Sequence, residues 1–558
     1  MILDLDDERA TEPALAGAKA AWLARARRAG LPVLAGVVLT ADASAAAMAF
    51  GAQALAHRGP GRARSTIWAL PLDGSMLSQL DTLVSRLGEP LVVRSSSVLE
   101  GDGAWSGAFA SFPDITLADL PTAIRGCWAS AFSVSALSRC ASSGVEPGSA
   151  QMAVLIQPAL APRFGGTARV EGTDVRVVGV ASSPAPLLQG REAGLVARIG
   201  PGDDVHGDAA MRVMGRALLI RVATAVREAS VRIGATSCEW AIADESVALL
   251  QLGRSGDRRT IGSLPSPDPL GDAAARIARI VRRAPGPLGE ALILPWAIAE
   301  TTLRADPRRD RSSLRHGSLA ALQLAAREAS SLTAHVWRLP EAEAAERSRQ
   351  VLRAMRSGDL TTTVRIIEGL REPDERRANR IRSLVAAVRR SLVELGEVAD
   401  VETAWYATVD RAAEVLRSGR VDRQRARVGV DRWVPFQAAV VRASGQRCFG
   451  TPAAPGIGFG RLCYIADLTR SDHFRSRDVI VTTHPVPGFG GLLWDAAGLV
   501  TTGGGPAAHL FEAARSLGLA AVCAVDFGDV VGDSLERASG RFAIAVDGES
   551  GVVDVTPW

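Results

Sequence analysis

The chain has 558 residues, a formal net charge of +4 and 47% hydrophobic residues, which excludes a disordered protein and predicts about three or four packed domains. Aromatic residues make up only 5% and basic residues form no long block, which argues against a nucleic-acid-binding protein. The six cysteines form no C-x-x-C pair, no apolar run is long enough to span a bilayer, and the acidic N-terminus lacks a signal-peptide core. We therefore expect a cytoplasmic protein without zinc, disulfides, nucleic acid or a membrane partner.

The first part of the chain, residues 1–255, has the mixed pattern of an α/β domain. A helix is expected around residues 15–29, and it contains Lys19, the only lysine of the chain. A lone lysine is most often an accident on a solvated helix face. The alternative is a phosphate contact, because a lysine ammonium is a compact, mobile charge, whereas a guanidinium is a rigid fork.

The strands expected in this part share short apolar runs rich in Val, Leu and Ile. They fall at residues 31–40, 90–96 and 151–160, and on both sides of a turn within residues 239–253. Arg94 directly follows the apolar residues of the second run and precedes serines and a glycine-rich turn. This arrangement suits a triphosphate cradle as well as it suits an ordinary surface loop.

Two oxygen-bearing side chains face each other across the expected hairpin. Glu239 precedes Gln251 by twelve positions, so antiparallel strands would bring both to one face of the sheet. Such oxygen ligands suit Mg²⁺. From the spacing alone, a polar hairpin edge is the more common explanation.

The composition changes after residue 254. Residues 255–272 are rich in Ser, Pro, Gly and Asp and are typical of a linker, and residues 270–441 are rich in Ala, Leu and Arg at helical spacing. We expect a helical domain there. Its His316, His335 and Trp337 are possible pocket residues, although core or surface positions are more common for each.

Residues 447–558 return to short strands separated by Gly and Asp turns. The stretch GIGFG at residues 456–460 is interpreted as a turn, because it lacks the full dinucleotide-binding pattern. A helix is expected from about His509 to Leu517, directly after three glycines. A histidine at a helix N-terminus can carry a phosphoryl group as a nucleophile. The alternative is a histidine that only packs at the helix start, and the glycines favour the first interpretation.

Several segments, in order, resemble the family of phosphoenolpyruvate synthase, pyruvate phosphate dikinase and rifampicin phosphotransferase. The similar segments are GAKAAWLARARRAGLPVLAGVVLT, VVRSSSVLEGDGAWSGAFASF, CWASAFS, EWAIADESVALLQ and TAWYATVDRAAEVLRSG, followed by most of residues 447–558. The resemblance covers roughly the first 255 and the last 140 residues. It implies an α/β multidomain protein, with an ATP-grasp-like domain at 1–255, a helical acceptor-binding domain at 270–441 and a swivelling phosphohistidine domain at 447–558.

The resemblance also implies roles for individual residues. Lys19 and Arg94 would contact the phosphates of ATP, and Gln157 would lie beside the adenine. Glu239 and Gln251 would surround Mg²⁺ and the phosphates, together with the region of Arg254. His509 would receive the phosphoryl group from ATP and swing to a second site.

This chain departs from the family pattern at four places. Gly253 stands where the family has an arginine, and Arg254 comes one position late. No G-L-G-E loop is evident. Ala508 replaces the usual Ser or Thr before the histidine, and Glu512 replaces an apolar residue, where it would orient the imidazole.

The expected function is that of an ATP-dependent dikinase-type phosphotransferase. It would use Mg²⁺ and the phosphohistidine, release AMP and phosphate, and phosphorylate a hydroxyl or nitrogen nucleophile on a metabolite or antibiotic. Because no C-terminal TIM barrel follows, pyruvate is not the expected acceptor. The alternative is a non-catalytic relative that binds a nucleotide or a protein partner, which the missing family arginine and glutamate favour. The sequence sets no oligomeric state.

Overall fold

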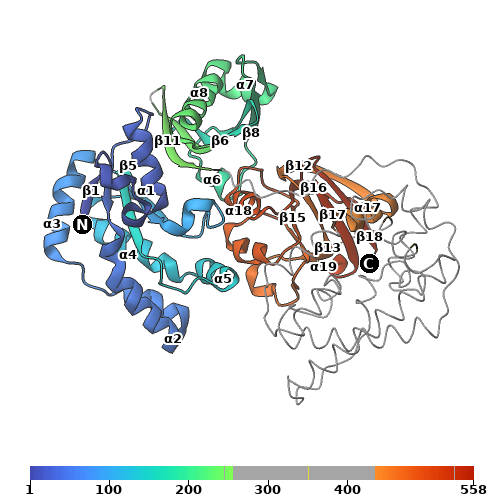
Figure 1. Cartoon of the computed structure of the whole chain (residues 1–558), viewed down its shortest axis with the longest axis horizontal. Coiled ribbons are helices and arrows are strands. Elements are labelled where there is room, and N and C mark those ends of the chain that lie inside the picture. The colour runs from blue at the N-terminus through green and yellow to red at the C-terminus, as the bar shows by residue number, and fades with distance from the viewer. Residues whose placement is uncertain (244, 255–342, 344–349, 351–433, 533, 558) are drawn as a thin grey trace.

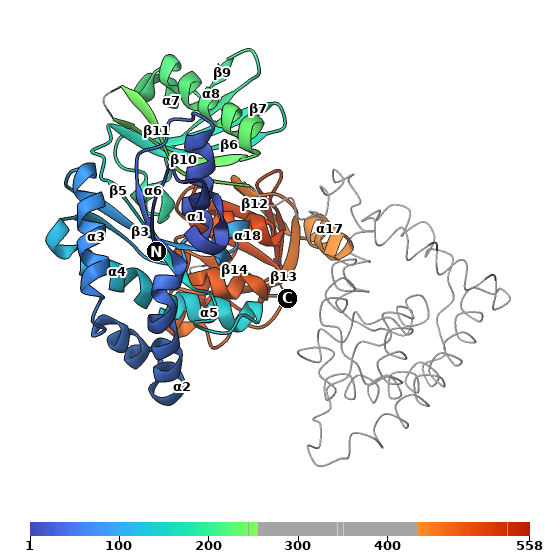
Figure 2. The ribbon, with the colours of Figure 1, turned by 60° about the vertical axis from the view of Figure 1, so that its left-hand side comes forward.

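The computed structural model describes residues 1–243, 245–254, 343, 350, 434–532 and 534–557. They form an N-terminal unit (1–254) and a C-terminal unit (434–557), which lie against each other in Figures 1 and 2. The predicted helical domain at 270–441, with His316, His335 and Trp337, lies almost entirely outside the described residues. No helix in the described part of the chain is both long and apolar enough to cross a membrane.

The first sheet of the N-terminal unit has five strands in the order β1-β2-β5-β3-β4. The buried centre is β5, whose first six residues are all buried, as the continuous apolar run from Met152 to Ile156 requires. Helices α1 to α5 accompany this sheet. The strands are β1 (Ile2–Asp4), β2 (Val37–Leu39), β3 (Leu91–Ser97), β4 (Ser111–Ile115) and β5 (Met152–Pro158), and the helices are α1 (Pro13–Arg28), α2 (Ala45–Trp68), α3 (Gly74–Val84), α4 (Leu120–Ala129) and α5 (Val134–Ser143).

The second sheet has six strands in the order β11-β10-β6-β7-β8-β9, all antiparallel. Helix α8 packs its apolar side, including Leu219, Val222 and Val226, into a core shared with α1 and this sheet. The strands are β6 (Phe164–Glu171), β7 (Asp174–Val180), β8 (Leu195–Ile199), β9 (Val205–His206), β10 (Ser237–Ala243) and β11 (Ser246–Gly253), and the helices are α6 (Ala185–Leu188), α7 (Asp208–Met214) and α8 (Arg216–Ile233).

The C-terminal unit is a closed barrel in the order β12-β16-β15-β14-β13-β17-β18. The pairs β13–β14, β14–β15 and β15–β16 are parallel. Parallel strands need crossover connections, and the connection from β15 to β16 contains α18. The strands are β12 (Gln446–Ala454), β13 (Ile457–Tyr464), β14 (Val479–Thr482), β15 (Gly498–Thr501), β16 (Ala521–Asp526), β17 (Phe542–Asp547) and β18 (Val552–Pro557), and the helices are α17 (Val434–Ser444), α18 (His509–Leu517) and α19 (Leu535–Ala538).

Helix α17 joins this barrel through a buried charge network. Arg442 donates to Asp554 and to Asp547, both at 3.0 Å, and the carboxylates of these aspartates are almost fully buried. Breaking a buried pair leaves an uncompensated charge, so this network fixes α17 on the barrel. The described residues 434–441, expected in the helical domain, therefore pack with the C-terminal unit.

Most predicted elements of the two units are confirmed, and two are wrong in extent. The strand expected at 31–40 is reduced to Val37–Leu39. The turn expected at 456–460 is limited to Gly456, because β13 starts at Ile457. The glycines inside β13 serve close packing: a Cβ at Gly458 would lie 2.4 Å from the carbonyl oxygen of Ala497, and one at Gly460 would lie 2.2 Å from that of Arg477.

Candidate functional site

His509 is the first residue of α18, directly after the strand-to-helix turn that the sequence predicts. Strand β15 ends at Thr501, and the N-cap residue Ala508 has no side-chain hydrogen bond with which to close the helix. The helix N-terminus therefore keeps free N–H groups and a partial positive charge beside His509.

The glycines before α18 allow close contact with the N-terminal unit. Gly504 has φ of +79°, and a Cβ there would lie 3.1 Å from the carbonyl oxygen of Gly190. A Cβ at Gly505 would lie 2.2 Å from the carbonyl oxygen of Ala193. The absence of side chains at Gly504 and Gly505 therefore lets the loop before α18 pack against the backbone of the N-terminal unit.

His509 forms a hydrogen-bonded cluster with one residue from each unit. Its Nδ1 lies 2.8 Å from Oγ of Ser106, which sits in the loop between β3 and β4 of the N-terminal unit. The same Oγ donates to Oε2 of Glu512 at 2.6 Å, and Nδ1 lies 3.5 Å from that oxygen. The expectation that Glu512 lies close to the imidazole agrees with this geometry, whereas no role was predicted for Ser106.

The hydrogen bonds define which imidazole nitrogen is available. Because the Ser106 hydroxyl proton is donated to Glu512, Oγ accepts from Nδ1–H. Nδ1 then carries the proton and Nε2 carries the lone pair. Burial raises the pKa of Glu512, but its contacts with His509, Ser106 and Arg515 outweigh burial and hold the pKa below its usual value. The carboxylate is therefore charged at neutral pH and lies 3.5 Å from Nδ1 of the imidazole.

A second contact between the units involves the fully buried Arg139 of α5. Its Nη2 donates to the carbonyl oxygens of Ser106 at 3.0 Å and of Pro487 at 3.1 Å. Burial lowers the pKa of Arg139 to about 10. Nearby, the ring of Trp105 meets that of Trp494 edge to face at 6.3 Å. Ser106 is thus held at an ordered, largely apolar interface.

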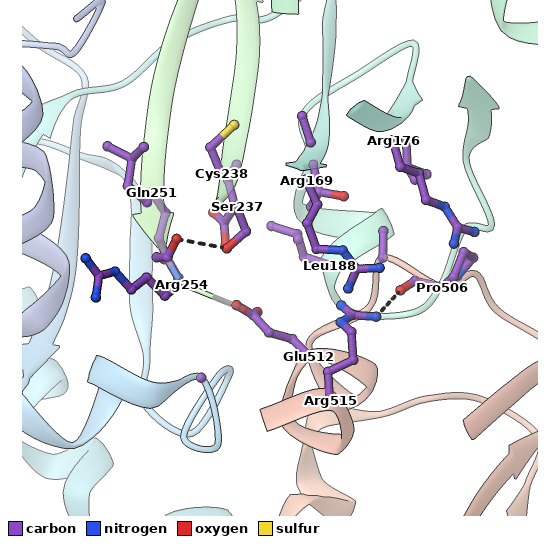
Figure 3. Close-up of a pocket in the computed structure, with 18 of the residues that line it drawn as sticks. Arg169, Arg176, Leu188, Ser237, Cys238, Gln251, Arg254, Pro506, Glu512 and Arg515 are labelled. Atoms are coloured by element: carbon purple, nitrogen blue, oxygen red, sulfur yellow. Dashed lines mark hydrogen bonds between the residues drawn. The ribbon is translucent and has the colours of Figure 1, made fainter. Parts of the chain in front are cut away.

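A pocket of about 810 Å³, including its open mouth, lies between the second sheet and α18 (Figure 3). One wall is the face of β10, β11, β6 and β7, and another is the loop after β3. The opposite wall comes from the C-terminal unit. That wall contains Pro506, Ala507, Glu512 and Arg515.

Two of the predicted oxygen ligands share this pocket. Glu239 and Gln251 are direct partners in the β10–β11 pairing, and both line the pocket. Arg94 of β3 lies beside them: its Nη2 is 2.9 Å from Oε1 of Gln251 and 3.5 Å from Oε2 of Glu239. The structure therefore brings these three predicted residues together.

A carboxylate and an amide oxygen facing a cavity suit Mg²⁺, which is often held by one or two protein oxygens, phosphates and water. Glu239 is 8% exposed, so a cation would help to compensate its burial beside Arg94. Within the described residues no group of three or more His, Cys, Asp or Glu forms a complete metal cage. The residues thus fit a magnesium ion that enters with phosphates.

Lys19 lies in α1 and is buried, not on a solvated face. Its Nζ lies 2.6 Å from Oε1 of Glu100 and donates to the carbonyl oxygen of Ser95 at 3.2 Å. A break in α1 at Gly17, with φ of +72°, brings the helix against the end of β3, where a Cβ would lie 2.1 Å from the Ser96 carbonyl oxygen. Lys19 does not line the pocket, but its partner Glu100 does.

The two remaining predicted residues lie apart from this group. Gln157 is buried in β5, where its amide donates to the carbonyl oxygen of Leu34 at 3.2 Å, and it does not line the pocket. Arg254 lines the pocket edge, but its Nε donates to the carbonyl oxygen of Gly234 at 2.9 Å and its guanidinium lies over the ring of Trp22. The Arg254 guanidinium therefore interacts with Gly234 and Trp22 at the edge of the pocket.

Sequence reasoning missed three arginines that line the same pocket. They are Arg169 of β6, Arg176 of β7 and Arg515 of α18. Arg169 and Arg176 come together through the pairing register of the second sheet, and Arg515 joins them through the packing of α18; no single sequence motif reveals either.

Two family models match segments of the chain that contribute residues to this site. Residues 13–173 match "Pyruvate phosphate dikinase, AMP/ATP-binding domain", and residues 474–551 match "PEP-utilising enzyme, mobile domain". In these two segments the chain is similar to pyruvate phosphate dikinase and to other enzymes that use phosphoenolpyruvate. His509 lies in the segment that matches the mobile domain, and Ser106 lies in the segment that matches the AMP/ATP-binding domain.

Curated relatives are similar to parts of the chain. A rifampicin phosphotransferase of Streptomyces sviceus is 27% identical over 191 residues, which cover 31% of this chain and 21% of the relative. A second rifampicin phosphotransferase, from a Streptomyces species, is 31% identical over 153 residues, 24% of this chain and 18% of the relative. The phosphoenolpyruvate synthase of Pyrococcus furiosus is 31% identical over 104 residues, 19% of this chain and 12% of the relative. The alignments thus span about a fifth or less of the relatives' lengths.

Proposed function

We propose that this protein is an ATP-dependent phosphotransferase in which His509 carries a phosphoryl group from ATP to a small-molecule acceptor. One observation carries the proposal. The His509 imidazole of the C-terminal unit is hydrogen-bonded to Ser106 of the N-terminal unit at 2.8 Å, and the next turn of its helix lines the pocket between the two units. The proposed nucleophile is thereby docked beside this pocket.

The first step balances as a displacement at phosphorus. Nε2 attacks the β phosphorus, a nitrogen–phosphorus bond forms, and the bond from the β phosphorus to the oxygen of AMP breaks, so that AMP leaves and a pyrophosphoryl group stays on His509. Water then attacks the γ phosphorus and the bond between the γ phosphorus and its bridging oxygen breaks, so that inorganic phosphate leaves and one phosphoryl group remains on His509. The Nδ1 proton stays on the ring, where the hydrogen bond to Ser106 and the charge of Glu512 stabilise the phosphorylated imidazolium.

The residues around Glu239 hold the nucleotide side of the reaction. Magnesium, when bound, neutralises charge on the phosphates and supplies Lewis-acid assistance. Glu239 and Gln251 would hold this ion, and Arg94, now bonded to both, would turn to the phosphates. Lys19 acts through Glu100, or reaches the phosphates directly once that ion pair opens.

The acceptor step requires the C-terminal unit to leave the pocket and present the phosphohistidine elsewhere. We assign the acceptor site to residues 270–441 and the acceptor to a hydroxyl or nitrogen nucleophile on a metabolite or antibiotic. Rifampicin is the first compound to try, because it appears in the names of two relatives.

Product analysis tests the proposal. The protein is incubated with ATP, Mg²⁺ and a panel of acceptors that includes rifampicin, and AMP, phosphate and ADP are separated and quantified. We expect AMP and phosphate in equal amounts, and none from His509→Ala. His206→Asn, a change at an exposed histidine of β9, serves as the matched control and keeps full activity. Release of ADP instead of AMP, or equal activity of His509→Ala, would contradict the proposal.

A second function is favoured by one specific observation. Gly253 stands at the position of the family arginine, and Arg254 is bonded to Gly234 and stacked over Trp22. A non-catalytic nucleotide-binding protein would lack just such a phosphate contact. Tight ATP binding without AMP release would select this alternative.

A further inference from the structure

The pairing register of the second sheet places a row of side chains along one wall of the pocket. Gly253 of β11 pairs with Ser237 of β10, Ser237 pairs with Arg169 of β6, and Arg169 pairs with Arg176 of β7. Side chains of directly paired residues point to the same face of a sheet. Arg169 and Arg176 therefore lie in the same row as Gly253 and on the same face of the sheet.

The neighbouring row on the same face contains Gln251 and Glu239, which pair with each other, and Thr167, which pairs with Glu239. Two residues along a strand advance by about 7 Å, so the oxygen ligands and the arginines are separated by roughly that distance. This is comparable with the span of one pyrophosphoryl group. One wall of the pocket thus offers a place for a metal ion beside a place for anionic oxygens.

The third arginine comes from the other unit. Arg515 follows His509 and Glu512 at intervals of three residues, so all three lie along one side of α18. Figure 3 shows Arg169 and Arg515 converging from opposite walls of the pocket, with Arg176 beside them. We call Arg169, Arg176 and Arg515 the arginine cluster.

Two carboxylates, those of Glu171 and Glu512, lie near the three arginines of the cluster. Glu171 accepts a hydrogen bond from Arg169, lies 4.0 Å from Arg176 and also pairs with Arg198 at 3.6 Å. Arg515 donates to the carbonyl oxygens of Ala453 and Pro506, which carry no net charge. Burial, and then the positive charges of Arg169 and Arg176, lower the pKa of Arg515 to about 9, although the charge of Glu512 partly offsets them. An anion in the pocket would relieve this repulsion.

We propose that the arginine cluster is an anion site, divided between the two units, for the pyrophosphoryl end of a nucleoside triphosphate. Its ligand bridges Arg169 and Arg176 on the sheet to Arg515 on α18. Phosphate oxygens match the planar fork of a guanidinium, which binds them through paired, charge-assisted hydrogen bonds. This site replaces the missing side chain at position 253 and favours docking of the histidine-bearing unit when a triphosphate is present. In assigning the anion to ATP, the inference rests on the proposed function.

Calorimetric titration of the full-length protein tests the site with three probes in Mg²⁺ buffer. The probes are AMP, inorganic pyrophosphate and a non-hydrolysable β,γ-imido analogue of ATP. In Arg169→Gln, Arg176→Gln and Arg515→Gln we expect the affinity for pyrophosphate and for the ATP analogue to fall on the order of 10- to 100-fold. AMP affinity should stay within about twofold, because AMP lacks the pyrophosphoryl end.

Arg163→Gln is the matched control, since Arg163 precedes β6, is exposed and pairs with Glu245 outside the pocket. Arg169→Lys keeps the charge without the fork, and its affinity should lie between those of wild type and Arg169→Gln. This variant also tests the site if Arg169→Gln fails to fold. Unchanged pyrophosphate affinity in the Arg169 and Arg176 variants would overturn the site, and unchanged affinity in Arg515→Gln alone would overturn its division between the units.

The inference and the proposed function fail in different ways. If His509 takes up no phosphate while pyrophosphate binding still depends on the arginine cluster, only the proposed function fails. If His509 is phosphorylated while the variants bind pyrophosphate like wild type, only the anion site fails. Binding of pyrophosphate that the ATP analogue cannot displace would assign the site to the free anion and overturn the link to the nucleotide.

Discussion

Replacing Ser106 with alanine removes a single hydroxyl that joins His509 to Glu512 across the interface. That hydroxyl makes contacts of 2.8 Å with Nδ1 and 2.6 Å with the carboxylate, so its loss leaves Nδ1 at 3.5 Å from Glu512 as its remaining contact. Hydrogen bonds to charged groups contribute about 1.5–3 kcal/mol. Because about 1.4 kcal/mol corresponds to a tenfold change in rate, phosphohistidine formation should slow by about 10- to 100-fold.

The assay is rapid-quench phosphorylation of the full chain at saturating ATP, in which a single turnover reports the first step alone. Ser142→Ala is the matched control, because Ser142 also bonds across the interface, to the carbonyl oxygen of Gly491 at 3.0 Å, but does not touch His509. That variant loses a neutral hydrogen bond of about 1 kcal/mol and should slow about fivefold at most. Ser106→Thr should keep most of the rate. Equal rates for Ser106→Ala and wild type, or equal losses for the two alanine variants, would refute a role in positioning the imidazole.

Three further changes test other parts of the site. Glu239→Gln should raise the Mg²⁺ concentration needed for half-maximal phosphorylation by about tenfold or more, because a carboxylate ligand is lost, and an unchanged magnesium titration would remove Glu239 from the metal site. Lys19→Met should lower the free energy of unfolding by about 3–5 kcal/mol, because it leaves Glu100 buried without its partner. In denaturant melts, the double variant Lys19→Met/Glu100→Gln should recover most of this stability, while its ATP affinity stays low. If the double variant recovered both stability and ATP affinity, Lys19 would be purely structural. Gly505→Ala should slow phosphorylation by about tenfold or more with little change in Tm, because its Cβ would lie 2.2 Å from the carbonyl oxygen of Ala193 in the other unit. Gly74→Ala is the control, because Gly74 has open space around it. A wild-type rate of phosphorylation in Gly505→Ala would show that this close contact is not needed.

Local patterns predicted the elements that carry their own signals. The strand, glycine turn and helix around His509 follow from a buried run, residues without a Cβ, and helical periodicity that begins where the glycines end. The pairing of Glu239 with Gln251 follows from hairpin spacing. In these cases the residues that determine the geometry are neighbours in the sequence.

What the sequence did not reveal depends on contacts between distant segments. Ser106 and His509 are separated by 403 positions, and their contact exists only because the two units pack together. The alignment of Arg169 with Gly253 depends on the registers of three strands, which turns and tertiary packing set. Gly458 and Gly460 were misinterpreted as turn residues because their close packing partners, Ala497 and Arg477, come later in the chain.

The central claim is that a nucleotide in the N-terminal unit charges the histidine of the C-terminal unit. The most direct measurement is to quench the full chain after one turnover with ATP at alkaline pH, which preserves phosphohistidine, and to locate the phosphoryl group by fragmentation mass spectrometry and by nuclear magnetic resonance of the phosphorylated ring. We predict one phosphoryl group, on Nε2 of His509. ATP consumption with the phosphoryl group on any other residue, or with none on the protein, would contradict the account.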